Sequence, residues 1–177
     1  MTGLPPPPAD ALALGERLAE RIRGELLVAG GALPFSRYME LCLYSPGLGY
    51  YSAGLQKFGV DGDFVTAPEI SPLFGRCLAQ CLADVLQTFG GGDILEIGAG
   101  SGRLAVDLLA GLEQLERLPD RYLILERSAD LRERQQALLR AELPRLADRV
   151  VWLDDLPETG YRGIIVANEV LDAMPVE

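Results

Sequence analysis

The chain has 177 residues, of which 49% are hydrophobic, and this is enough apolar material for a domain with a core. Its formal net charge of −10 disfavours nucleic acids and anionic membrane surfaces as partners, since both would repel it. The chain has no histidine and an odd number of cysteines, so we expect neither a zinc site nor a disulfide framework. Cys42, Cys77 and Cys81 are predicted to pack in the core, which fits a reducing compartment.

The first part of the chain predicts a short leader followed by helices. Residues 1–10 include "LPPPPAD", a stiff proline-rich segment that should stay outside the core, and Asp10 is expected to cap a helix from Ala11 to Val28. A second helix is predicted from about Ser36, capped by its own hydroxyl. Since the first thirty residues have no apolar stretch typical of a signal peptide or a membrane span, we expect a cytoplasmic protein without membrane insertion.

Residues 11–91 are interpreted as an N-terminal helical and loop region, and the pattern of apolar residues changes in residues 92–177. In the second segment short apolar runs alternate with helical spacing, which predicts a parallel sheet with helices on both faces. The expected fold class is therefore α/β, with a doubly wound sheet. The four predicted strands are "DILEIG" (93–98), "RYLILE" (121–126), "RVVWL" (149–153) and "RGIIVAN" (162–168).

A glycine-rich bend follows the first of these strands. Gly98, Gly100 and Gly102 would let backbone amides approach a ligand without interference from a Cβ atom. Arg103 stands where a dinucleotide fingerprint has its third glycine, which disfavours a nicotinamide site. Glu96, just before the bend, would repel a pyrophosphate but attract a sulfonium or ammonium group, directly or through water. A tight strand-to-helix turn without a ligand is the alternative.

Acidic residues also end the next two predicted strands. Glu126 would emerge beside the glycine bend, where a carboxylate can accept hydrogen bonds from both hydroxyls of a ribose. Asp154 and Asp155 follow the third strand and could accept from an adenine amino group. The alternatives are a solvated acid at a strand end for Glu126 and ordinary turn residues for the two aspartates.

These motifs resemble class I S-adenosylmethionine-dependent methyltransferases. The stretches "GDFVTAPEISPLFG" and "ANEVLDAMPVE" are similar to the signatures of the MidA family, the mitochondrial complex I assembly factors and their bacterial relatives. The resemblance implies a Rossmann-like sheet whose first four strands have the order 3-2-1-4, and S-adenosyl-L-methionine as cofactor. It also implies arginine methylation of a subunit of respiratory NADH dehydrogenase, or of its bacterial counterpart, and a mitochondrial matrix location for the eukaryotic relatives.

The resemblance also suggests roles for particular residues. The three glycines of the bend would hold the methionine part of the cofactor and Glu126 the ribose, while residues 62–71 would cover the cofactor. Within that segment Thr66, Pro68 and Glu69 are the expected binding residues. Ser71 and Pro72 independently predict the cap and first position of a helix. We expect both interpretations to hold, because Asp63, Thr66 and Glu69 supply more polar side chains than a cap requires.

Polar residues follow the fourth predicted strand, at the sheet edge where open α/β sheets bind ligands. Asn168, Glu169 and Asp172 are the candidate catalytic residues. A guanidinium is a poor nucleophile, and carboxylates can orient it and stabilise its positive charge as the proton leaves. The alternative is that these residues only cap the next helix.

The family's sheet has seven strands, whereas four are found here, so the chain resembles the N-terminal half of a longer protein whose fourth strand would be an unpaired edge. Two other functions stay open at this point. One is a cofactor-binding assembly chaperone without essential methyl transfer, and the other is a nucleotide-binding oxidoreductase domain. A protein substrate is the expected partner, and a homodimer is a further expectation.

Overall fold

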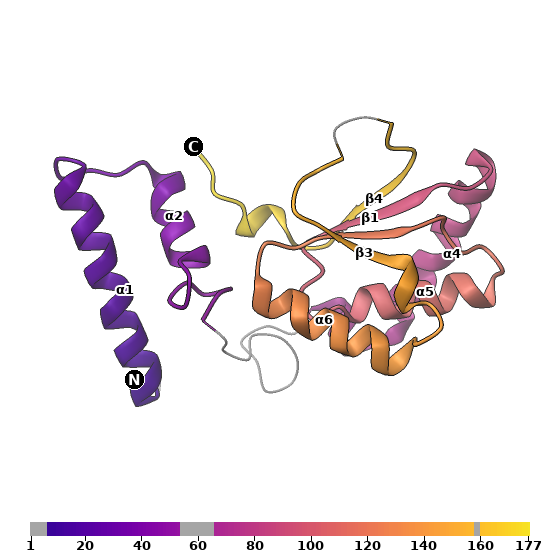
Figure 1. Ribbon diagram of the computed structural model, residues 1–177, viewed down its shortest axis with the longest axis horizontal. Helices are drawn as coiled ribbons and strands as arrows, with labels where there is room; N and C mark the ends of the chain where they lie inside the picture. Colours follow the sequence, from indigo (N-terminus) through magenta and orange to yellow (C-terminus); the bar gives the residue numbers. More distant parts are fainter. Residues whose placement is uncertain (1–6, 54–65, 158–159) are drawn as a thin grey trace, which may run out of the picture. The chain divides into compact units, whose positions relative to one another are not determined.

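The computed structural model describes residues 7–53, 66–157 and 160–177. The chain divides into two compact units (Figure 1). The first unit comprises Met1–Leu55 together with Leu171–Glu177, and the second comprises Gln56–Val170.

The first unit contains helices α1 (Ala9–Val28) and α2 (Phe35–Tyr44) and the 3₁₀ helix η2 (Leu171–Ala173). The predicted caps of both α-helices are wrong. Each helix follows a proline and has no side-chain cap, because the fixed φ of proline sets the entry into the helix without a side-chain acceptor. Asp10 lies instead in the first turn of α1, where its carboxylate accepts a hydrogen bond from the N–H of Ala11 at 2.9 Å.

Polar contacts connect the elements of the first unit. The Arg37 guanidinium of α2 donates to both carboxylate oxygens of Glu25 on α1, at 2.6 and 2.9 Å. The Tyr44 hydroxyl donates to the Ala173 carbonyl at 2.9 Å and so ties η2 to α2. Helix α1 buries none of its residues, and α2 buries Leu41. Ion pairs and hydrogen bonds therefore connect the elements of this unit, together with a small buried apolar contact.

The second unit is built on four parallel strands in the order β3-β2-β1-β4. This confirms the predicted fold class and strand order. The register places Glu96 opposite Ile124 on one side and Val166 on the other. The strands are β1 (Asp93–Ile97), β2 (Tyr122–Leu125), β3 (Val150–Leu153) and β4 (Gly163–Ala167).

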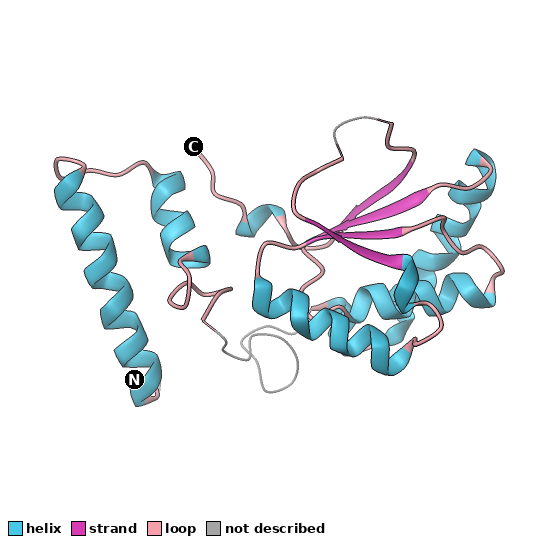
Figure 2. Ribbon diagram, in the orientation of Figure 1, coloured by secondary structure: helices cyan, strands magenta, loops and turns pink. Residues whose placement is uncertain are grey.

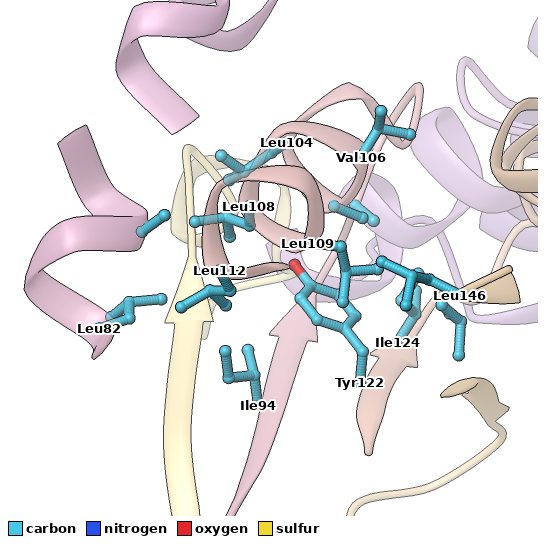
Figure 3. Close-up of a cluster of buried hydrophobic side chains, with 14 of the residues drawn as sticks. Leu82, Ile94, Leu104, Val106, Leu108, Leu109, Leu112, Tyr122, Ile124 and Leu146 are labelled. Carbon is cyan, nitrogen blue, oxygen red and sulfur yellow. The ribbon is translucent and has the colours of Figure 1, made fainter. Parts of the chain in front are cut away.

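Helices of the second unit pack on one face of this sheet (Figure 2). They are α4 (Pro72–Phe89), α5 (Arg103–Gln114) and α6 (Ala129–Glu142), while the short helix α3 (Ala67–Ile70) contacts α4 and α5, and the 3₁₀ helix η1 (Ala147–Arg149) precedes β3. The core lies between α5 and the sheet, where Leu108, Leu109 and Leu112 are fully buried against Ile94 and Tyr122 (Figure 3). Ser71 caps α4 as predicted, since its hydroxyl accepts from the N–H of Leu73 at 3.2 Å.

On the opposite face of the sheet, the exposure of the side chains differs between the central and the outer strands. Leu95 and Leu123 on the two central strands are buried, whereas Val151 on β3 and Ile165 on β4 are 40% and 58% exposed. The sequence predicted helices on both faces, but the described residues that join β3 to β4 form no helix. Apolar side chains therefore remain accessible on this face of the second unit.

The prediction that all three cysteines lie in the core is wrong. Cys77 and Cys81 are exposed on α4, and Cys42 is half-buried. The buried side of α4 is formed by small residues and leucines, and the two cysteines fall on its other side. Those buried residues are Gly75, Ala79, Leu82, Ala83 and Leu86.

Among the helices of the described ranges, none combines the length and the apolar character needed to cross a membrane.

Candidate active site

The glycine bend leads from β1 directly into α5. Gly98, Gly100 and Gly102 have φ angles of 66°, 55° and 85°, in the left-handed region that favours glycine. A Cβ atom at Gly98 would lie 3.0 Å from a methyl carbon of Val170, and one at Gly102 would lie 3.2 Å from Cγ of Gln135. Both the backbone conformation and the close neighbours therefore require glycine at these positions.

Three consecutive amides of this bend are available to a ligand. The N–H groups of Ala99, Gly100 and Ser101 donate to no acceptor within the described ranges, whereas those of Gly98 and Gly102 donate to the carbonyls of Leu125 and Ala99. Adjacent free N–H groups at a helix N-terminus attract a negatively charged group. The bend therefore fits a carboxylate such as that of a methionine moiety.

Glu96 points into the core, because it lies on the same face of β1 as Ile94. Only 2% of the residue is exposed, and Oε2 accepts a hydrogen bond of 2.7 Å from the hydroxyl of Tyr122. Burial raises the pKa of Glu96 to about 7, the hydrogen bond from Tyr122 opposes this rise, and the nearby Glu126 carboxylate adds to it. The residue predicted to face a cation is thus held by a tyrosine of the neighbouring strand.

Glu126 follows the end of β2, as predicted, and accepts hydrogen bonds from neighbouring backbone and side-chain donors. Oε1 accepts from the N–H of Ser128 at 2.9 Å, and Oε2 accepts from the side-chain amide of Gln135 at 3.2 Å. The residue is 8% exposed. Burial raises the pKa of the Glu126 carboxyl, and these two hydrogen bonds act in the opposite direction. A carboxylate has about four lone-pair sites, so Glu126 keeps acceptor capacity for a ligand hydroxyl.

The segment predicted to cover the cofactor reaches the glycine bend through α3. Glu69 accepts a hydrogen bond from the Ser101 hydroxyl, and the same hydroxyl oxygen accepts from the N–H of Arg103 at 3.2 Å. Thr66 precedes α3 without capping it, and Pro68 is buried within it. The predicted residues 62–65 lie outside the described residues. Helix α3 and the bend are therefore linked by one serine side chain.

The third strand ends in a polar bend that is tied to the second. The Arg132 guanidinium donates to the carbonyls of Glu126 and Leu153, at 3.0 and 2.9 Å, and to the Asp154 carboxylate at 3.0 Å. Asp154 is therefore engaged by an arginine of α6, and both Asp154 and Asp155 are exposed at the bend. Both carboxylates are therefore accessible, and Asp154 is the one of this pair that forms an ion pair among the described residues.

Asn168 and Glu169 follow β4 at its carboxyl end, beside the strand that leads into the glycine bend. Asn168 is half-buried and Glu169 is exposed. Glu169 has a φ of 51°, a left-handed conformation that side-chain-bearing residues rarely adopt and that costs about 1–3 kcal/mol. Asp172 is an exposed residue of η2 and belongs to the first unit. The sheet thus brings the predicted carboxylates Glu126 and Glu169 to the same edge.

Gln135 lies at the candidate site, and the sequence analysis missed it. It is completely buried and contacts both the glycine bend and Glu126. The available signal was its spacing, since it lies four residues after Leu131 and four before Leu139, both of which are buried. A polar residue in the apolar stripe of a helix marks a place where a buried side chain needs hydrogen-bond partners.

Comparison with known proteins places this arrangement in a family. A solved structure of a protein from Burkholderia thailandensis, bound to S-adenosyl-homocysteine, is 52% identical with a TM-score of 0.90, over 98% of this chain and 46% of that chain. The mitochondrial protein arginine methyltransferase NDUFAF7 homologs of Drosophila melanogaster and Caenorhabditis elegans are 29% and 28% identical over 90% of this chain.

The chain spans about two fifths of the length of these curated relatives, 41% in each case. The corresponding protein of Mus musculus is 31% identical over 82% of the chain and 39% of its own length. Residues 76–177, more than half of the chain, match the family model described as S-adenosyl-L-methionine-dependent methyltransferase. The chain therefore belongs to this family of S-adenosyl-L-methionine-dependent methyltransferases.

Proposed function

We propose that the protein transfers the methyl group of S-adenosyl-L-methionine to an arginine side chain of a protein substrate, a subunit of respiratory NADH dehydrogenase or its bacterial counterpart. The observation that carries this proposal is the meeting of a glycine bend with free amides, the carboxylate of Glu126 and the carboxylate of Glu169 at one edge of the sheet. The names of the relatives as protein arginine methyltransferases support the choice of acceptor.

The proposed cofactor contacts follow from the charges at this edge. The bend at Gly98, Gly100 and Gly102 holds the methionine carboxylate through its amides, and Glu126 accepts hydrogen bonds from the two ribose hydroxyls. Asp155 accepts from the adenine amino group. Thr66, Pro68 and Glu69 cover the cofactor from the side of α3, where Glu69 already contacts Ser101. Glu96 supports the end of β1 that leads into the bend, because its buried carboxyl accepts a hydrogen bond from Tyr122.

Bound S-adenosyl-L-methionine supplies an electrophilic methyl group on a positively charged sulfur. The protein's part is to align the nucleophile with that methyl group, because an in-line displacement depends mostly on position. Glu169 is exposed, and its carboxylate is suited to a bidentate contact with a guanidinium. Asn168 orients the same group.

An incubation with labelled methyl donor tests the proposal. The protein is mixed with S-adenosyl-L-methionine carrying an isotopic label and with a respiratory NADH dehydrogenase preparation, and the arginines of its subunits are mapped by mass spectrometry. We expect label on an arginine. Cofactor binding without label on any subunit would favour an assembly chaperone, and binding of NADH in preference to S-adenosyl-homocysteine would favour an oxidoreductase domain.

A further inference from the structure

Gln135 of α6 is the centre of a buried hydrogen-bond network at the candidate cofactor site. Its side-chain nitrogen donates to the carbonyl of Gly100 at 2.9 Å and to Oε2 of Glu126 at 3.2 Å. Its side-chain oxygen accepts from the indole N–H of Trp152 on β3, at 2.9 Å. One amide group thus links the glycine bend, the acid that ends β2, and the next strand.

The orientation of this amide follows from the chemistry of its partners. An indole N–H can only donate, so it requires the amide oxygen, whereas a carbonyl and a carboxylate can only accept from the amide nitrogen. The reversed orientation would place donor against donor and acceptor against acceptor. Because Gln135 has no exposed surface, water cannot replace a lost partner from outside. The network therefore has a single satisfied arrangement.

We propose that Gln135 is a positioning residue for S-adenosyl-L-methionine, because its amide fixes the Glu126 carboxylate and the glycine bend relative to each other. The inference rests on the proposed role of Glu126 as the ribose acceptor. The two donors of one amide group hold the two places at which the cofactor is gripped, the methionine end at the bend and the ribose at Glu126. Helix α6 also packs closely against the bend, since a Cβ atom added at Gly102 would lie 3.2 Å from Cγ of Gln135.

The first test replaces the amide without changing the length of the side chain. Gln135→Met removes both donors to the site, and we expect S-adenosyl-homocysteine to bind at least about tenfold more weakly by calorimetry, since two buried hydrogen bonds are lost. Gln136→Met is the matched control, because this glutamine follows on the same helix and is half-exposed. An unchanged affinity in folded Gln135→Met would overturn the proposal.

A spectroscopic readout separates positioning from general stability. Trp152 is the only tryptophan of the 177 residues and donates directly to Gln135, so its emission should respond when a ligand engages Glu126. We expect S-adenosyl-homocysteine to shift this emission in the unchanged protein and in Gln136→Met, and not in Gln135→Met. The same shift in Gln135→Met would show that the amide does not connect the two residues.

The second variant, Gln135→Glu, keeps the acceptor for Trp152 and replaces the amide nitrogen by oxygen. It can donate to Glu126 only while it is protonated, so its affinity for S-adenosyl-homocysteine should improve more steeply than that of the unchanged protein as the pH is lowered. A profile parallel to that of the unchanged protein would overturn the inference. The Gln135→Glu measurement tests the inference if Gln135→Met does not fold.

Failure of this inference is distinguishable from failure of the proposed function. If Glu126→Ala weakens binding of S-adenosyl-homocysteine and neither Gln135 variant does, Glu126 holds the cofactor without help from Gln135. If none of these variants changes the affinity, the cofactor does not bind at this edge of the sheet.

Discussion

The hydroxyl of Tyr122 on β2 donates a hydrogen bond of 2.7 Å to the carboxyl of Glu96 on β1, and both side chains are buried in the core. This pair places an ionisable group directly before the glycine bend. Because burial raises the pKa of Glu96 to about 7, its protonation state changes within the physiological range of pH.

The first prediction is a pH dependence of stability that comes from Glu96. Its pKa is raised from the ordinary 4.5 to about 7 on folding, so between these values the folded state binds more protons than the unfolded state. The free energy of unfolding should therefore fall as pH rises from about 4.5 to about 7, and this loss should be complete above about pH 7.

Glu96→Gln removes this titration while keeping an acceptor for Tyr122. Urea unfolding at several pH values should show that the stability of Glu96→Gln relative to the unchanged protein increases with pH across that window. Glu133→Gln, an exposed substitution on α6, should show no such trend. A stability difference that is the same at every pH would mean that Glu96 titrates alike in the folded and unfolded states.

The second prediction concerns the acid at the end of β2. Glu126→Ala should weaken binding of S-adenosyl-homocysteine at least about tenfold, since each charge-assisted hydrogen bond contributes about 1.5–3 kcal/mol before water compensates. Calorimetry measures the affinity, and circular dichroism checks that the fold is intact. Glu133→Ala is the control, because that carboxylate is exposed on α6. Unchanged affinity would remove Glu126 from the ribose role.

The third prediction separates backbone strain from crowding in the glycine bend. Gly102→Ala introduces a Cβ at a φ of 85°, 3.2 Å from Cγ of Gln135, whereas Gly90→Ala introduces one at a φ of 69° with open space around it. Both substitutions should destabilise the protein by about 1 kcal/mol or more through strain. Only Gly102→Ala should also weaken binding of S-adenosyl-homocysteine, which calorimetry would measure. Equal affinities in the two variants would indicate that crowding at Gln135 has no consequence for the cofactor.

The sequence was sufficient for the sheet but not for the direction of every side chain on it. Continuous apolar runs predicted all four strands within one or two residues, and Glu126 was identified because it ends one of them. Strand alternation places Glu96 on the same face as Ile94, toward α5, and its attraction for a cation, directly or through water, stays a prediction. The tyrosine that engages it lies on another strand, so only the sheet register reveals the pair.

The errors have a common cause, because residue type and spacing do not show which neighbouring helix or strand a side chain contacts. Gln135 was missed because glutamine usually lies on a helix surface, and its three partners come from other segments of the chain. Cys77 and Cys81 were expected in the core from residue type alone. The side of α4 that packs against α5 is instead the one with Gly75, whose added Cβ would clash with Cβ of Asp107.

The fourth prediction follows from the exposed face and edge of the sheet. The outer edge of β4 pairs with no strand in the described ranges, and Ile165 on this strand is 58% exposed. The 177-residue chain should therefore self-associate, and light scattering at several concentrations should show a rising average mass. Ile165→Lys should reduce this association, whereas Arg162→Lys just outside the strand should not. A monomer at all concentrations would contradict this prediction.

The most direct test of methyl transfer is a paired measurement on Glu169→Gln. This variant keeps the shape of the side chain but removes the charge that favours a cationic guanidinium. Single-turnover transfer to the arginine-bearing substrate should fall on the order of a hundredfold or more, while calorimetry should find the affinity for S-adenosyl-L-methionine almost unchanged. Glu116→Gln is the matched control, since Glu116 is also exposed and also has a positive φ, of 55°. Transfer at the unchanged rate in Glu169→Gln would contradict the assignment of this carboxylate to the arginine substrate.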